Sequence, residues 1–516
     1  MKFNCLHIVA VLSFVGVSAQ TNDSIHIPTN SLYNAQYEKI WENPIQYSQF
    51  KVRDFTETEL SATIKELNLK RAQTAQKSNI FAFKTQGIFN ISENLRVLGG
   101  FDYQFVSEKD LGYNLTSERT EDQFVMNPHY IFAPKKANWE SQKYRVMGGL
   151  SYNYSNFDFG LTVDYRNNNS FRKSDPRPAI NTADYSGKAF VGYHLKKHQI
   201  SIFGGLGRKT DSYDLDFVND QNNSPANEDY FVRFSDGYGR LLHFVSYSNF
   251  GYKTISGNAG AGYAYRGEKN LFTINYSYSK SMETLFGKSA NGYTFFDESL
   301  EQMKYRVKNY QTDANYWYKG NSIQYFGNLN FQSITGDNYS LTELGQNYRM
   351  TLDRLSLNQS LLWKDHDKTI LGLGLQTIFS DFSARDLLGV TSKYVKSIDI
   401  NLSANKDILK NDKQRVNILV GAKSYFPISE SIDYQAASST NLFYDNVIKN
   451  DYYYDKTSKL GPQIGLQFFQ RISNKTDLKI FTNFATLFPL NSVMDENVNY
   501  NGNPNMIFNT GISLYY

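Results

Sequence analysis

The chain has 516 residues, of which 41% are hydrophobic, 20% charged and 16% aromatic. No apolar run of roughly 18 residues follows the first twenty residues, which excludes a helical membrane protein. A disordered chain would not hold this many aromatic residues. The formal net charge of +4 is weak and scattered, so we expect no nucleic-acid partner.

The N-terminus has the layout of a secretory signal peptide. Met1 and Lys2 form a short basic region, residues 6–17 are mostly apolar, and small residues end at Ala19. This pattern predicts cleavage after Ala19. The single cysteine, Cys5, lies in the part that would be removed, so we expect a mature chain without disulfides or cysteine-bound metals.

Alternation of apolar and polar residues with a period of two dominates the rest of the chain. In residues 141–154, Val146 and Leu150 share one face, and Lys143 and Arg145 share the other. Many of these segments are longer than strands of soluble sheets. One apolar face and one polar face on a long strand are typical of a wall between lipid and water.

Tight polar turns separate pairs of these segments, at residues 92–94, 155–156, 196–197, 267–269, 319–321, 365–367, 410–412 and 473–475. Between consecutive tight turns lie two strands and a longer polar connection, for example residues 167–183, 209–256, 282–304 and 427–457. Short connections at one end and long ones at the other indicate periplasmic turns and extracellular loops.

We therefore predict an all-β fold, a transmembrane antiparallel up-and-down β-barrel. Eight periplasmic turns, two periplasmic termini and an even strand count give 18 strands. The first strand is expected within residues 56–71, where a helix is the alternative. Counts of 16 and 20 stay open, because residues 124–133 and 230–247 each fit an extra strand or a structured loop.

The chain then divides into a signal peptide (residues 1–19), an N-terminal periplasmic or luminal segment (20–55) and the barrel (56–516). The N-terminal segment has one aromatic anchor, in the run Trp41-Glu42-Asn43-Pro44. It fits a small plug, a partner-binding segment or a disordered leader about equally.

Aromatic residues gather beside the tight turns, as expected for a girdle at the headgroup boundary. They are Tyr193, Tyr265, Trp317, Tyr318, Trp363, Phe468 and Phe469. The last segment places Phe508, Ile512, Leu514 and Tyr516 on one face. An amphipathic strand that ends on an aromatic residue resembles the C-terminal signal read by the barrel assembly machinery, which implies that machinery as a partner during biogenesis and outer-membrane lipid as the surroundings.

The chain is similar to an uncharacterised family of outer-membrane barrels, known only as a domain of unknown function. The local resemblance lies in Arg172-Lys173-Ser174-Asp175-Pro176-Arg177-Pro178. It implies a barrel in the cell outer membrane of a Gram-negative bacterium and no established activity. The chain differs from TonB-dependent transporters, which carry a large N-terminal plug, because only residues 20–55 precede the barrel here.

Extrapolated alternation places many charged residues on the inner face. The candidate lumen-lining residues are Lys143, Arg145, Asp158, Asp164, Arg166, Lys188, Arg266, Arg354, Arg415 and Lys423, and the same face includes Asp184, Asp313, Asp399, Arg471, Asp477 and Lys479. A barrel of this size leaves an aqueous lumen unless something fills it. The excess of basic positions favours anionic or zwitterionic solutes. For any single residue, the alternative is an ion pair across neighbouring strands.

The run Arg172, Asp175, Pro176, Arg177 and Pro178 lies in a predicted extracellular loop. Proline fixes φ, so Arg177 stands on a stiff, extended backbone. This motif fits a solute-binding loop folded into the lumen. A rigid clamp between loops is the competing interpretation, since Asp-Pro marks turns.

The sequence predicts no catalytic, cofactor-binding or metal-binding set, and therefore no enzyme. Oxygen-bearing residues gather between Asp211 and Asn222, but without the spacing of a calcium loop. His243 with Ser246 is the one local pairing of a base and a hydroxyl, and no acid partner can be assigned.

The preferred function is a passive, porin-like channel of the outer membrane for small polar solutes, anionic ones included. The alternative is a non-enzymatic accessory or binding barrel within a larger outer-membrane transport or assembly complex. Its motivation is the length of the predicted loops, far above that of ordinary connections. A third interpretation is a transporter of hydrophobic solutes, with residues 20–55 as a small plug.

Overall fold

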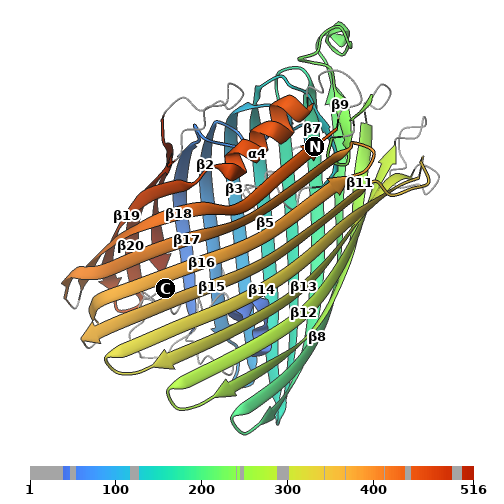
Figure 1. Cartoon of the computed structure of the whole chain (residues 1–516). Helices are drawn as coiled ribbons and strands as arrows, with labels where there is room; N and C mark the ends of the chain where they lie inside the picture. The colour runs from blue at the N-terminus through green and yellow to red at the C-terminus, as the bar shows by residue number, and fades with distance from the viewer. Residues whose placement is uncertain are drawn as a thin grey trace, which may run out of the picture.

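The computed structural model describes residues 39–46, 54–116, 127–239, 241–243, 249–287, 301–341, 343–365, 368–411, 413–435, 443–490 and 503–516. The predicted signal peptide and most of residues 20–55 lie outside these ranges. The described chain forms one closed antiparallel sheet of 18 strands (Figure 1). No helix within the described ranges is long and apolar enough to span a membrane.

The strands follow one another around the wall in chain order, and most have 14 to 21 residues. They are β1 (Phe55–Glu66), β2 (Lys77–Asn90), β3 (Leu95–Leu111), β5 (Ala137–Tyr154), β6 (Phe157–Arg172), β7 (Arg177–Leu195), β8 (His198–Asp216), β11 (Asn249–Arg266), β12 (Asn270–Gly287), β13 (Glu301–Lys319), β14 (Ile323–Ser340), β15 (Tyr348–Asp365), β16 (Lys368–Asp386), β17 (Thr391–Lys410), β18 (Gln414–Tyr434), β19 (Lys459–Ser473), β20 (Thr476–Pro489) and β21 (Asn505–Tyr515).

The barrel closes where the first strand meets the last. β1 pairs with β2 on one side and with β21 on the other, so that Leu60 lies opposite both Phe83 and Ile512. The first and last strands are therefore neighbours, and the sheet has no free edge. This confirms a strand rather than a helix within residues 56–71, and the count of 18.

The predicted tight turns all connect consecutive strands at one end of the barrel, for example between Tyr154 and Phe157. His366, Asp367 and Asp412 of these turns lie outside the described residues. The predicted extents of the long connections are wrong. Residues 167–183, expected as a loop, are strand except for a short turn after Arg172, and the other three connections also lose residues to strands. Polar residues are compatible with strand here, because this part of the wall stands beyond the lipid.

The described parts of residues 124–133 and 230–247 add no strand to the wall. They contain β4 (His129–Phe132), β9 (Arg233–Asp236) and β10 (Leu241–His243), which form a separate three-stranded sheet. The side chains of β4 are all buried. Ile131 of β4 and Phe234 of β9 pack with wall residues that include Trp139 and Phe250, so this sheet lies within the barrel mouth formed by the long connections.

The outer face is apolar between two aromatic belts. Toward the long connections, directly paired tyrosines pack in three places: Tyr103 with Tyr144, Tyr165 with Tyr185 and Tyr278 with Tyr310, with ring centroids 5.0, 4.8 and 4.9 Å apart. Near the tight turns, Phe157 packs on Tyr193 and Tyr316 on Tyr325. Outward leucines, isoleucines and phenylalanines between the belts are exposed, as a lipid-facing band requires.

Two residues expected in the girdle are not on the outer face. Trp317 and Phe469 are buried, at 2% and 4% exposure, and their alternation with outward neighbours turns both toward the lumen. A Trp-Tyr or Phe-Phe pair puts one ring on each face of a strand, so only one member of each pair can meet lipid.

We expect a charge in the middle of the outer band to destabilise the barrel. Leu329→Arg places a guanidinium in lipid and should cost about 2–4 kcal/mol. Leu344→Arg is the matched control, because Leu344 is 75% exposed in a turn among the long connections. Denaturant unfolding in lipid vesicles measures both, and equal stability of the two variants would contradict the placement of the band.

Candidate functional site: the lumen and the segments at its two ends

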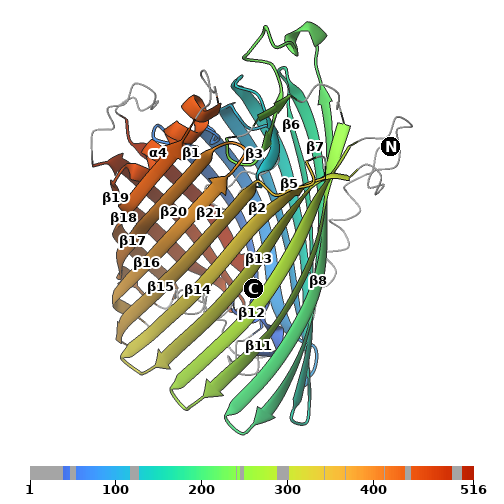
Figure 2. The same cartoon turned by 45° about the vertical axis from the view of Figure 1, so that its right-hand side comes forward.

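A short N-terminal segment lies inside the barrel near the tight turns. Residues 39–42 form one helical turn, followed by η1 (Pro44–Gln46). The segment contacts strands from β2 round to β15, which is possible only from within the wall. Both views show this blue segment behind the front strands (Figure 2). We call residues 39–46 the luminal segment.

Ile40 fixes the luminal segment in an apolar pocket. Its side chain is fully buried, and Trp41 packs beside it. The pocket is lined by Ile88, Leu98, Leu271, Trp317, Phe326 and Leu362. Burial of one isoleucine contributes roughly 1.5–3 kcal/mol. Trp317 therefore packs against the luminal segment inside the barrel and does not contact lipid.

Polar contacts orient the luminal segment beside this pocket. Lys39 Nζ lies 3.0 Å from Asp313 Oδ1 and 2.9 Å from Glu42 Oε2. Burial disfavours the ammonium charge, but Glu42 and Asp313 outweigh it and raise the pKa of Lys39. Gln46 Nε2 donates to Asn275 Oδ1 at 3.1 Å. Asn275 of β12 is paired with Asp313 of β13, so both ends of the segment are held by the same part of the wall.

The wall leaves room for the other end of the luminal segment. Gln199 Nε2 donates to the carbonyl oxygen of Ile45 at 3.1 Å. Gly160 and Gly192 lie beneath the same residue, where an added Cβ would come within 2.7 and 2.9 Å of the Ile45 side chain. Glycine at these two positions allows the segment to approach the backbone of β6 and β7.

A second set of folded connections packs inside the opposite end. The sheet of β4 and β9 packs between the upper wall and η5 (Tyr444–Ile448). η5 leads into α4 (Lys449–Lys456), which lies across the rim (Figure 1). One side contacts wall residues that include Trp139, Ile180, Phe250 and Leu285. The other contacts Phe443, Val447 and Ile448. We call β4, β9, η5 and α4 the cap.

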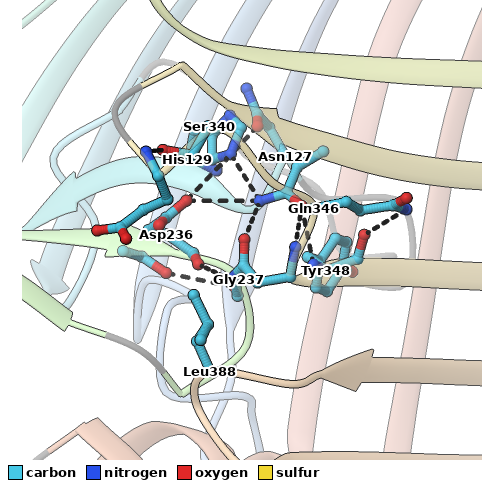
Figure 3. Close-up of polar contacts among 12 residues, drawn as sticks. Asn127, His129, Asp236, Gly237, Ser340, Gln346, Tyr348 and Leu388 are labelled. Atoms are coloured by element: carbon cyan, nitrogen blue, oxygen red, sulfur yellow. Dashed lines mark hydrogen bonds and ion pairs between the residues drawn. The ribbon is translucent and has the colours of Figure 1, made fainter.

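A buried polar network attaches the cap sheet to the wall (Figure 3). Asn338 Nδ2 lies 3.2 Å from His129 Nε2 and donates to Asn347 Oδ1 at 2.7 Å. His129 also lies 3.4 Å from the Asp236 carboxylate. Asn347 Nδ2 donates to the Asp236 carbonyl at 2.6 Å and to Asp386 at 3.0 Å. The network therefore joins β4 and β9 of the cap to β14 and β16 of the wall.

Gly237 permits the close approach in this network. The backbone N–H of Tyr238 donates to Asp386 Oδ2 at 2.7 Å, and the N–H groups of Leu388 and Gly389 donate to Oδ1. Gly237 has φ +135°, and a Cβ there would lie 2.4 Å from Asp386 Oδ2. A side chain at this position would be strained by its backbone and would meet the carboxylate.

A second buried network attaches α4. Arg71, in the β1–β2 connection, donates Nη1 to Asp455 Oδ2 at 2.9 Å, and Lys393 Nζ lies 2.6 Å from the same oxygen. Burial disfavours both carboxylates of α4. At Asp455 the two cations outweigh burial and lower the pKa, whereas at Asp451 burial dominates and raises the pKa. Asp451 accepts from the N–H of Ala72 at 2.9 Å.

Between the luminal segment and the cap, a row of directly paired inward residues crosses nine neighbouring strands. In order these are Glu59, Lys84, Asp102, Arg145, Arg166, Asp184, Lys209, Thr254 and Glu283. Asp164 balances the adjacent arginines, 2.9 Å from Arg145 Nε and 3.1 Å from Arg166 Nε. We call this set the charged row.

The charged row climbs from one end of the lumen to the other. Glu59 is the fifth residue of β1, Arg166 the tenth of β6 and Glu283 the fourteenth of β12, each counted from the tight-turn end. A row perpendicular to tilted strands rises along the barrel axis. At its upper end, Glu283 accepts a hydrogen bond from Asn127, next to the cap sheet.

The structure brings several of the predicted lumen-lining residues together. Arg145, Asp164 and Arg166 form one cluster. Asp158 is fully buried and pairs with His194 near the tight turns, and Arg415 lies 2.7 Å from Asp407. Lys143, Lys188, Arg266, Arg354 and Lys423 occupy positions of the same inward alternation on other strands. Contact of any of them with a solute stays a prediction.

The predicted loop motif is a short turn whose polar atoms hold neighbouring connections. Arg172 is buried and donates to the carbonyls of Ser174, Asp175 and Lys135. Asp175 accepts from the N–H of Val218 at 2.9 Å and pairs with Arg177 at 3.2 Å. Pro176 ends the turn and Pro178 lies within β7. These contacts favour the clamp, while solute binding by this motif stays untested.

The acidic stretch from Asp211 to Asn222 was expected as one loop, and this is wrong for its first half. Asp211, Asp214 and Asp216 lie on β8, where Asp211 is buried and Asp216 pairs with Arg177. Within the described ranges, no group of three or more His, Cys, Asp or Glu could hold a metal. Ser246 and the side chain of His243 lie outside the described residues.

Sequence reasoning missed the two networks of the cap. Their members lie on connections or at strand ends, where no period marks the buried face. The residues that close the tight-turn end were partly visible, since Asp313 belonged to the expected inward set and Trp41 was noted as an anchor. Nothing in the sequence paired Lys39 with Asp313, which are joined only through the closed barrel.

Residues 44–516 match the model of a family of unknown function, DUF6850. The chain belongs to this family. The matched residues contain all 18 strands of the wall, η1 and the cap. No curated protein matches the sequence at a significant level.

Matches among solved structures include two receptors and a transporter, all at low identity and low overlap. The ferric preacinetobactin receptor BauA from Acinetobacter baumannii has 9% identity and a TM-score of 0.39, and covers 90% of this chain and 80% of that chain. The alcaligin receptor FauA from Bordetella pertussis has 9% identity and 0.41, covering 90% and 76%. The copper transporter OprC has 7% identity and 0.42, covering 90% and 80%. At this overlap no property of these proteins is transferred.

We expect Arg71→Met to loosen the cap. The substitution leaves the buried Asp455 with one cation fewer, and breaking a buried pair costs about 3–5 kcal/mol. Lys173→Met is the matched control, because Lys173 pairs with Glu140 at the surface and is 73% exposed. Hydrogen exchange of residues 443–456 measures the effect. Equal protection in the two variants would show that Arg71 does not hold α4.

Proposed function

We propose that the chain is a non-enzymatic outer-membrane channel for small polar solutes, and that the state described here is closed. The closed barrel with an apolar outer band supports a place in the outer membrane. The inner wall is polar, and the charged row runs through the whole distance between the luminal segment and the cap. That row is the observation on which the proposal rests.

The charged row suits passage better than a filled core. Arg145 and Arg166 are half exposed inside the barrel, with side-chain exposures of 38% and 55%. Charged side chains are rarely buried without pairing, and here water-accessible ones line an interior between two closed ends. With Lys188 nearby on β7, cationic groups and carboxylates alternate along the row, so the lumen offers partners to polar solutes of either charge.

Closure at both ends distinguishes this channel from a permanently open pore. The luminal segment sits across the lower lumen, and the cap fills the upper mouth with apolar contacts and two buried networks. Passage therefore requires movement of at least one of these closures. Because the segment has far fewer contacts than the cap, it is the closure expected to move first.

A second candidate function is an accessory barrel in a larger complex. It is favoured by apolar side chains on the tips of two neighbouring connections: Leu344 is 75% exposed, Leu387 58% and Leu388 53%. The N–H of Leu387 donates to the carbonyl of Asn347, so the two tips lie side by side. The native mass of the gently solubilised protein discriminates, because a stable heteromeric complex supports this candidate and a lone monomer disfavours it.

We expect stepwise conductance from the purified, folded chain in planar bilayers, with selectivity set by the charged row. Asp164→Asn removes the carboxylate between two arginines and should shift the reversal potential in a salt gradient toward anion preference. Arg166→Gln should shift it the opposite way. Arg306→Gln is the control, because Arg306 pairs with Asp337 on the outer face.

Absence of conductance steps would count against the channel only if it persists when the luminal segment is displaced. Conductance with unchanged selectivity in Asp164→Asn and Arg166→Gln would place the conducting path elsewhere. In that case the charged row would serve only as ion pairs within the wall.

A further inference from the structure

The part of the wall that holds Lys39 and Ile40, which we call the seat, has the composition of a ligand-binding site. It combines one carboxylate, Asp313, with the apolar pocket that holds Ile40. The distance from Lys39 Nζ to Asp313 Oδ1 is 3.0 Å, so the structure itself shows an ammonium group bound there. The site therefore suits an ammonium group next to a branched aliphatic side chain.

The wall side of the seat is organised independently of its occupant. Asp313 Oδ2 accepts from Asn328 Nδ2 at 2.8 Å and from Asn330 Nδ2 at 3.3 Å, and Asn315 Nδ2 donates to Oδ1. Asn328 Nδ2 also donates to Asn315 Oδ1 at 2.8 Å. These neighbouring amides keep the carboxylate in place when the ammonium leaves, and a preorganised site binds at a lower cost of ordering.

Several buried polar atoms of the luminal segment have no hydrogen-bond partner in the seat. Asn43 is 3% exposed, and neither its amide nitrogen nor its amide oxygen has a hydrogen-bond partner among the described residues. Trp41 Nε1 and Gln46 Oε1 are also buried without partners. Buried polar atoms without partners weaken the fit. The Asp386 carboxylate, which holds the cap from β16 of the wall, by contrast accepts several hydrogen bonds.

We propose that this seat is an exchangeable binding site for a short peptide segment with a lysine followed by a branched aliphatic residue. In the present state the chain's own Lys39 and Ile40 occupy it. A peptide of this kind arriving at the tight-turn end competes with the luminal segment and displaces it. The site deepens the proposed channel function, since the displaced segment would open the lower end, but binding itself does not depend on conductance.

Thiol labelling of position 43 reports on the seat directly. In the full chain with Cys5→Ser, Asn43→Cys places the single thiol where the native amide makes no hydrogen bond. A hydrophilic maleimide should label it slowly compared with Asn94→Cys, a cysteine in an exposed tight turn. Similar labelling rates at the two positions would overturn the seating of the segment.

Loss of the ion pair should release the segment. In the Asn43→Cys background, Asp313→Asn removes the carboxylate that binds Lys39, and we expect labelling roughly tenfold faster, since loss of one partner of a buried pair strongly favours the open state. Asp407→Asn is the matched control, because Asp407 pairs with Arg415 away from the segment. Lys39→Gln tests the same contact without changing the wall, which covers the case in which Asp313→Asn does not fold.

The ligand test uses the synthetic octapeptide of residues 39–46, with both ends blocked, added to the Asn43→Cys chain with its native Lys39 and Asp313. Labelling should rise with peptide concentration. The same peptide with Lys39→Gln should need at least tenfold more to reach the same rate. Labelling that ignores the peptide, or responds equally to both peptides, would overturn an exchangeable lysine-selective site.

The two proposals fail separately in these measurements. Peptide-dependent labelling without conductance steps would retain the binding site and reject the channel. Conductance that responds to the charged row, together with labelling that never responds to peptide or to Asp313→Asn, would retain the channel. Residues 39–46 would then be a fixed element inside the barrel and not an exchangeable occupant.

Discussion

Closure of the wall is the constraint on which the rest of the structure depends. No water is available in lipid to bind a free backbone N–H or C=O group, so a sheet can span a membrane only without edges. The pairing of β1 with both β2 and β21 removes the edges. It also fixes the direction of every side chain, because alternate residues then face lipid or lumen around the entire circumference.

This alternation explains why the wall was predictable from sequence and its contents were not. The residues two positions away from Leu329 and from Arg145 have the same character, which indicates the face on which each lies. The tight turns mark where each hairpin reverses. The extents of strands beyond the lipid could not be predicted, because both faces of β6 are polar from Arg166 to Ser170. Residues 167–169, three asparagines in a row, therefore resembled a loop although they are strand.

The cap and the luminal segment are held in different ways, and only the position of the luminal segment could be predicted from the sequence, as one of several alternatives. The cap depends on residues far apart in the chain, such as Arg71 with Asp455 and His129 with Asp236, that meet only after the barrel has formed. No local pattern predicts such pairs. The luminal segment is instead a short run with its own aromatic and aliphatic anchors, and its position could be named as one of several alternatives from Trp41 alone.

The contrast between the closures carries a functional argument. The cap contributes to three buried apolar clusters and pairs its buried Asp455 with Arg71 and Lys393, so opening it would expose charges and apolar surface together. The luminal segment is attached by one isoleucine pocket, one ion pair with the wall and two amide hydrogen bonds, and leaves polar atoms of its own without partners. If the charged row is a path for solutes, the energetic difference between its two ends makes the tight-turn end the entrance whose state is regulated. The cap then acts mainly as a filter of fixed shape.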